Sequence, residues 1–192
     1  TITYSGTNLT IERDFTQSGT FDLTGKTVTL DGVDAGDDST VTCGTLDGTL
    51  VISKSTTTND FVTIAANCSV NLGAGPTSTI GNASGVGLNV NGTVTIDSGT
   101  WTVTGSGTGD VIVNSGGTIT HSGTGWDLNN AGLLNTAGGT ITYSGTSLTI
   151  ERDFTQSGAL TATGLTVTLD ENAAADDSNV SCTGTWSGGL TI

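Results

Sequence analysis

A short phrase that recurs along the chain is the feature that most constrains its fold. Three versions of it stand at NGTVTIDSG (91–99), GGTITHSG (116–123) and GGTITYSG (138–145). Their first threonines are 25 and 22 residues apart. Apolar and Thr residues alternate after them, as in a strand with one face over a core. A strand-and-turn phrase with a period of about 20–25 residues predicts a β-solenoid, in which each coil stacks on the one before.

A longer repeat is superimposed on this period. Residues 1–19 recur as residues 140–158 with a single change, Asn8 against Ser147. The similarity continues at the same offset of 139 until an insertion near Thr183 changes the offset to 140. The near identity includes outward positions, so it favours either recent duplication or a surface that must be the same in each copy.

We therefore predict a single all-β domain, a parallel β-solenoid of about eight coils with a repeat unit of about 140 residues. The domain covers 1–192, with a full unit at 1–139 and the start of a second at 140–192. The composition fits, because a narrow solenoid core needs only one or two apolar residues per strand and the chain is 33% hydrophobic. Thr and Val favour strands, and the 30 glycines supply turns.

The charge balance is acidic, with 18 Asp and Glu against 4 Lys and Arg and a net charge of −14. Such a surface repels phosphates, which argues against nucleic acid as a partner. The sequence has no apolar run of about 18 residues, so we expect no membrane insertion. It starts at Thr1 without a Met and without a signal-peptide pattern. We expect a processed product or a piece of a longer protein, with a cleaved export signal as the simplest account.

The segment NGTVTIDSGTWTVTGSGTGDVIVNSGGTITHSG (91–123) and its relatives resemble the Gly- and Thr-rich β-helix arrays of prokaryotic surface proteins. That group includes filamentous adhesins, autotransporter passengers and cell-envelope fibres. The resemblance lies in composition and rhythm and carries no catalytic motif. It implies a right-handed parallel β-helix, export to the cell surface or beyond it, and a structural or adhesive role.

Two acidic turns are candidate Ca²⁺ sites, because dense carboxylates on a Gly-containing turn can supply the oxygen ligands that this ion needs. Their spacing is not that of an EF-hand, and a solvated turn whose aspartates cap the backbone is the alternative. The candidate ligands are Asp31, Asp34, Asp37 and Asp38 in the first copy and Asp170, Asp176 and Asp177 in the second.

The three cysteines suggest a cross-link between coils. Cys43 and Cys68 are each in phase with inward apolar residues and lie 25 residues apart, about one coil. Strands of adjacent coils are about 4.8 Å apart, which suits a disulfide, and an exported protein permits one. Two buried thiols are the alternative. Cys182 is the second-copy equivalent of Cys43, and its expected partner near position 208 would come from a continuing array or a neighbouring molecule.

The phrase IERDF contains half of the basic residues of the chain and stands in both copies. Strand phase predicts that Arg13 shares the face of the apolar Leu9 and Ile11. The phrase is a candidate subunit contact, and solvated, weakly paired charges are the alternative. The residues concerned are Glu12, Arg13 and Asp14, with their copies Glu151, Arg152 and Asp153.

The remaining signals are weaker. His121 is the only histidine, and its sister phrase has Tyr143 in its place, so we expect a structural role and no enzyme activity. Outward Thr-X-Thr ranks suggest ice binding as an alternative, although the sequence spacing between ranks is uneven. The chain has five N-glycosylation sequons. They begin at Asn8, Asn67, Asn82, Asn91 and Asn179.

The function expected from the sequence is a self-assembling building block of an extracellular fibre, sheath or layer, with copies of itself as the partner. The chain begins on the strand phrase TITYSG and ends on GGLTI without an evident cap. Open solenoid ends favour head-to-tail contacts that do not close. The alternatives are an adhesive stalk that binds a glycan or a host surface, and an ice-binding solenoid. No cofactor is expected apart from the candidate Ca²⁺.

Overall fold

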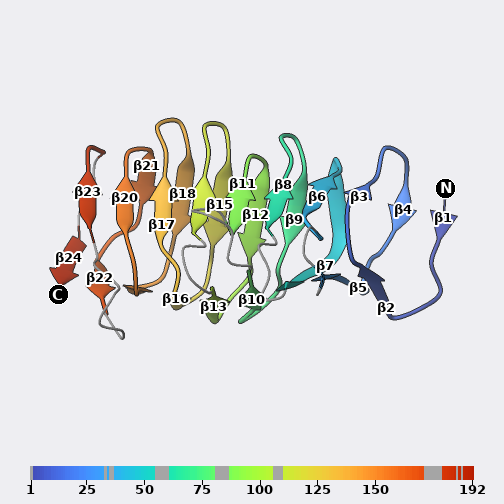
Figure 1. Cartoon of the computed structure of the whole chain (residues 1–192), viewed down its shortest axis with the longest axis horizontal. Coiled ribbons are helices and arrows are strands. Elements are labelled where there is room, and N and C mark those ends of the chain that lie inside the picture. Colours follow the sequence, from blue (N-terminus) through green and yellow to red (C-terminus); the bar gives the residue numbers. More distant parts are fainter. Residues whose placement is uncertain are drawn as a thin grey trace.

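The chain winds into a parallel β-solenoid of about seven turns, which confirms the predicted fold class (Figure 1). The structure is a computed structural model that describes residues 2–32, 34, 37–54, 61–80, 87–105, 110–170, 179–184, 186 and 188–192. All regular elements in these ranges are strands. The coils lie side by side along the long axis, and the two ends of the chain lie at opposite ends of that axis.

Each coil contributes a strand to three faces in turn. The first face contains β1 (Ile2–Thr3), β4 (Phe21–Asp22), the beginning of β7 (Thr45–Lys54), β9 (Ser69–Asn71), β12 (Thr93–Ile96), β15 (Thr118–His121), β18 (Thr140–Tyr143) and β21 (Ala159–Thr161). The second face contains β2 (Asn8–Ile11), β5 (Thr27–Gly32), the end of β7, β10 (Thr77–Thr79), β13 (Thr100–Thr104), β16 (Gly125–Asn129), β19 (Ser147–Ile150), β22 (Leu165–Leu169) and β24 (Gly188–Thr191). The third face contains β3 (Phe15–Thr16), β6 (Ser39–Thr42), β8 (Val62–Ile64), β11 (Leu88–Val90), β14 (Val111–Val113), β17 (Leu133–Asn135), β20 (Phe154–Gln156) and β23 (Val180–Cys182).

The number of residues per coil varies, and among the described pairs the register shifts only between β7 and β9, near Thr45 and Thr49. Paired residues are 19 apart where Ser147 faces Thr166 and 26 apart where Phe154 faces Val180. The solenoid has about seven turns, one fewer than the eight coils expected, and the described part of the third face contains eight strands. Corners between strands therefore absorb differences in coil length.

Alternation along each strand builds the core. In β12, Val94 and Ile96 are buried and the intervening threonines are half-buried. The same pattern recurs in β5, β15 and β22, so columns of Val, Leu and Ile run through the solenoid axis. Parallel backbone ladders and apolar columns together stabilise a chain with few charges.

An aromatic column occupies the middle of the core. Trp101 and Trp126 are paired in register and stack with ring centroids 4.9 Å apart. His121 and Tyr143 are also paired in register, and their rings meet edge to face at 4.9 Å. Stacking of large rings on successive coils fills the interior where the second and first faces meet.

The two copies of the long repeat have the same local structure. Asn8 pairs with Thr27 in the first copy, and their equivalents Ser147 and Thr166 pair in the second. The next step differs by one residue, because Thr27 pairs with Thr49 whereas Thr166 pairs with Gly189. That difference is the insertion near Thr183. The strand register is thus kept while a corner takes up the extra residue.

Candidate functional site

The first face carries an ordered array of hydroxyl groups, which we call the hydroxyl face. One column follows the register from Thr95 through Thr120 and Thr142 to Thr161. A second column joins Thr93, Thr118 and Thr140. Neighbouring coils are about 4.8 Å apart, and alternate residues of one strand are about 6.6 Å apart. The ranks are regular in space although they are unevenly spaced in sequence, because the corners absorb the difference.

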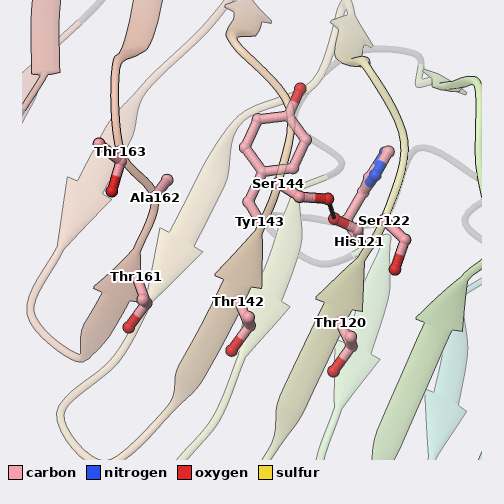
Figure 2. A pocket seen from close by; sticks show the side chains of 9 residues that line it. All are labelled: Thr120, His121, Ser122, Thr142, Tyr143, Ser144, Thr161, Ala162 and Thr163. Atoms are coloured by element: carbon pink, nitrogen blue, oxygen red, sulfur yellow. Dashed lines mark hydrogen bonds between the residues drawn. The ribbon is translucent and has the colours of Figure 1, made fainter.

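A groove of about 340 Å³ crosses the C-terminal part of the hydroxyl face (Figure 2). The hydroxyls of Thr120, Thr142 and Thr161 point the same way from three adjacent strands. Three more residues with hydroxyl groups line the groove just beyond the ends of these strands. These residues are Ser122, Ser144 and Thr163. His121, Tyr143 and Ala162 complete the lining, so the groove offers both hydroxyl groups and apolar surface, and no Asp, Glu, Lys or Arg lines it.

His121 lies beneath this face and is fully within the core. Its side chain is 1% exposed and packs between the rings of Trp126 and Tyr143. Nδ1 accepts a hydrogen bond from the Gly123 amide at 2.9 Å, and burial lowers the pKa of the imidazole to about 4. The hydroxyl of Ser144 donates to the main-chain carbonyl of His121, not to the imidazole. This arrangement fits a neutral structural ring rather than a general base.

The acidic turn of the first copy surrounds a buried lysine that the sequence did not single out. Lys54 is 2% exposed, and its Nζ donates to the main-chain carbonyls of Glu12, at 2.8 Å, and of Asp37. A Cβ on Gly32 would come within 2.7 Å of this Nζ and of Asp37 Cβ, so a larger residue there would displace Lys54 or Asp37. Residues of three successive coils meet at this ammonium group. Lys54 thereby brings a positive charge to the turn proposed for Ca²⁺.

The described aspartates of the first turn have separate hydrogen-bond partners. Asp37 is buried and accepts the amide of Asp34, while Asp38 accepts the amide of Phe61 and Asp31 is half-buried. Within the described ranges, no three His, Cys, Asp or Glu side chains are grouped as metal ligands. Asp170 is exposed, and Asp176 and Asp177 lie outside the described residues. Calcium binding stays a prediction.

The phrase IERDF connects neighbouring coils. Asp14 Oδ1 accepts the amide of Thr40 in the following coil at 2.8 Å, and its copy Asp153 accepts the amide of Asn179 at 2.8 Å. In the other direction, Glu151 Oε2 accepts the amide of Asn130 in the preceding coil at 2.6 Å. The copy of Glu151 in the first unit, Glu12, is exposed, and Arg152 is half-buried. Asp14, Asp153 and Glu151 therefore join coils within one chain, and the subunit contact stays a prediction.

Arg13 does not share the inward face of Leu9 and Ile11, so that expectation is wrong. Strand β2 ends at Ile11 and the chain bends at Glu12 and Arg13, which breaks the alternation. The Arg13 side chain is 71% exposed and pairs with Asp37 at 3.2 Å. Because the guanidinium is largely in water, this ion pair contributes little stability.

Cys43 and Cys68 form a disulfide between adjacent coils, with Cα atoms 4.6 Å apart. The bond closes a loop across 25 residues and is buried. Cys182, the equivalent of Cys43, is an exposed free thiol. The sequons differ in exposure: Asn8, Asn67 and Asn179 are exposed. Asn91 is half-buried and accepts from Asn114 at 2.9 Å, and Asn82 lies outside the described residues.

Comparison with known proteins gives no match, whether to a protein-family model, to a curated protein or to a solved structure. The described part of the chain also has no helix long and apolar enough to cross a membrane. The case for function therefore rests on the Thr-rich solenoid itself. Sequence reasoning missed Lys54 and the alignment of the hydroxyl ranks. One sequence feature could have indicated that Lys54 is buried, namely its position at the end of the apolar alternation in GTLVISK (48–54).

Proposed function

We propose that this protein is a structural building block of an extracellular fibre, sheath or layer, in which solenoid coils stack head to tail. The observation that carries the proposal is the position of the exposed large apolar side chains. Among the described residues these are Ile2, 64% exposed, Leu190, 44% exposed, and Ile192, 94% exposed. All lie on the two end coils of the solenoid, whereas its sides are polar.

The long repeat supplies an internal control for this observation. Ile141, the copy of Ile2, is 0% exposed because the preceding coil covers it. Leu50 and Ile52, the copies of Leu190 and Ile192, are 1% and 2% exposed. The same sequence positions are thus buried wherever a further coil is present. An additional coil at either end would remove this apolar surface from water.

Backbone chemistry supports the same proposal. Among the described strands, the outermost β1, β2 and β3 present unpaired main-chain groups at one end, and β21, β23 and β24 do so at the other. A head-to-tail contact between such ends does not close, and it generates filaments. The disulfide Cys43–Cys68 and the acidic charge fit an oxidising, extracellular setting.

Electron microscopy of the purified protein in negative stain tests the proposal. We expect filaments or sheets with the width of one solenoid or of bundles of it. Replacing Ile2 and Leu190 by Lys should suppress assembly and leave the circular dichroism spectrum unchanged, because charges on strand edges prevent pairing. Lysine in place of the lateral Thr142 is the matched control and should not prevent end-to-end assembly. Monodisperse particles at every protein concentration would contradict the proposal.

The hydroxyl face favours ice binding as a second candidate function, because its columns form a flat and regular array. Thermal hysteresis of the freezing point tests this candidate. A protein that binds ice should show hysteresis that is lost when Thr120 and Thr142 are both replaced by Lys. The same pair of substitutions at Thr102 and Thr149, on the second face, is the control. Absence of hysteresis in the unmodified protein would remove the candidate.

A further inference from the structure

We propose that the groove across the hydroxyl face is a binding site for a neutral sugar ring. This inference does not depend on assembly, because the groove lies on the side of the solenoid, across β15, β18 and β21. Coils stand on both sides of it. Strand β12 pairs with β15 before the groove, and β24 pairs with β22 in the coil that follows β21.

The two copies of the long repeat diverge where this groove is formed. Residues 20–23 read TFDL and their copies 159–162 read ALTA, without one shared residue. Between residues 1–31 and their copies, the other changes are only Asn8 to Ser147 and Lys26 to Leu165. Divergence concentrated in one strand favours a local change of function over general drift of the sequence.

One of these changes makes room in the groove. Leu23 is 0% exposed in the first copy, and its equivalent in the second is Ala162. Ala162 lies one coil beyond Tyr143, because the residues before them, Thr161 and Thr142, are paired. Alanine lacks the branched end of leucine, and a site that loses side-chain volume keeps part of it as a cavity. The resulting groove, about 340 Å³, is near the lower end of the range for small-molecule sites.

Another change removes a charge from the same place. Asp22 is exposed in the first copy, and its equivalent in the second is the exposed Thr161. The net charge of −14 disfavours anionic ligands throughout the surface. A cation would find no carboxylate in the groove to compensate for its lost hydration. The groove therefore suits a neutral ligand.

The hydroxyl groups of the groove match those of a sugar. The hydroxyls of Thr120, Thr142 and Thr161 point the same way from three strands (Figure 2). Each Ser or Thr hydroxyl can donate and accept, as each hydroxyl of a sugar can. A purely apolar ligand would take water from these groups without replacing its hydrogen bonds.

The apolar part of the lining matches the remainder of a sugar ring. Ala162 and Tyr143 line the groove beside the hydroxyl groups. The C–H groups on one side of a sugar ring can pack on such surface while its hydroxyls bond to the rim. Ser144 already donates to the His121 carbonyl at 3.2 Å, so its oxygen is left to accept from the ligand.

Saturation-transfer NMR of the full chain tests the inference with the methyl glycosides of glucose, galactose, mannose and N-acetylglucosamine. The measurement follows the sugar, so it applies to single molecules and to filaments alike. We expect a saturable signal for at least one of the four sugars. No saturable binding of any of them would overturn the inference, even if filaments form.

Two pairs of variants locate the bound sugar. Ala162→Leu restores the residue of the first copy and fills the groove, so binding should weaken at least about tenfold. Leu160→Phe also restores a residue of the first copy in the same strand, but outside the groove, and should bind as before. Thr142→Val removes one hydroxyl group and should weaken binding about tenfold. Thr95→Val, in the same column but outside the groove, is its control.

Circular dichroism of each variant shows whether its fold is kept. Weaker binding by Ala162→Leu and Thr142→Val, with unchanged binding by both controls, supports the site whether or not the protein assembles. If Ala162→Leu does not fold, the comparison of Thr142→Val with Thr95→Val decides alone. Equal binding by the groove variants and the unmodified protein would overturn the inference, because the sugar would then bind elsewhere.

Discussion

Replacement of both Cys43 and Cys68 by Ala is expected to lower the free energy of unfolding by about 3 kcal/mol. The disulfide joins adjacent coils, and without it the unfolded chain regains the freedom of a loop that spans 25 residues. Alanine avoids burying new hydroxyl groups, since Cys68 is 0% exposed and Cys43 is 7% exposed. Urea unfolding followed by circular dichroism gives the difference directly.

Two comparisons control this experiment. Cys182→Ala removes an exposed thiol and should leave the unfolding midpoint unchanged. Addition of a reductant to the unmodified protein should reproduce the instability of the double variant. Coincident unfolding curves with and without reductant would show that the bond is not formed in solution, and would remove one argument for an oxidising location.

The second large effect is the dependence of stability on pH through His121. Burial lowers the pKa of this imidazole in the folded protein from 6.5 to about 4. Above about pH 6.5 the group is neutral in both states and contributes nothing. As the pH falls from about 6.5 to about 4, the unfolded chain binds a proton that the folded protein does not. Stability should therefore decrease over this window by a total of about 3 kcal/mol and then level off.

The variant His121→Asn isolates this contribution from that of the carboxylates. Asparagine does not titrate, and its side-chain oxygen is placed to accept the Gly123 amide that Nδ1 accepts now. The variant loses ring packing and is less stable at every pH. The decrease in its free energy of unfolding between about pH 6.5 and 4 should be smaller by the amount that His121 contributes. An unchanged slope would mean that His121 is accessible to protons in the folded state, and would reopen a chemical role for it.

Much of the fold follows from local pattern, because a solenoid repeats one local rule. The phrases at Thr93, Thr118 and Thr140 are predicted from their spacing alone to stack, and they pair in the structure. Cys43 and Cys68 are one coil apart in the sequence, and this separation suffices to predict that they are neighbours in space. These inferences succeed because each depends on one strand and its nearest neighbour.

The features that sequence reasoning missed depend on several coils at once. Lys54 donates a hydrogen bond to the carbonyl of Glu12, 42 residues away in the sequence. No local sequence pattern predicts that contact. The position of Arg13 was wrongly predicted because strand phase ends where the chain bends. The pairing of Asn135 with Gln156 becomes visible only when the columns across coils are known. The lengths of the corners decide which residues of successive coils stand in one column. The periodicity of a single sequence does not specify those lengths.

Head-to-tail assembly requires that the coils of successive units stack along one axis with their strands perpendicular to it. X-ray diffraction from aligned filaments of the purified protein measures this arrangement. We expect a strong reflection along the fibre axis at about 4.8 Å, the spacing of paired strands. A reflection of that spacing perpendicular to the fibre axis, or filaments without it, would contradict head-to-tail stacking of the solenoid.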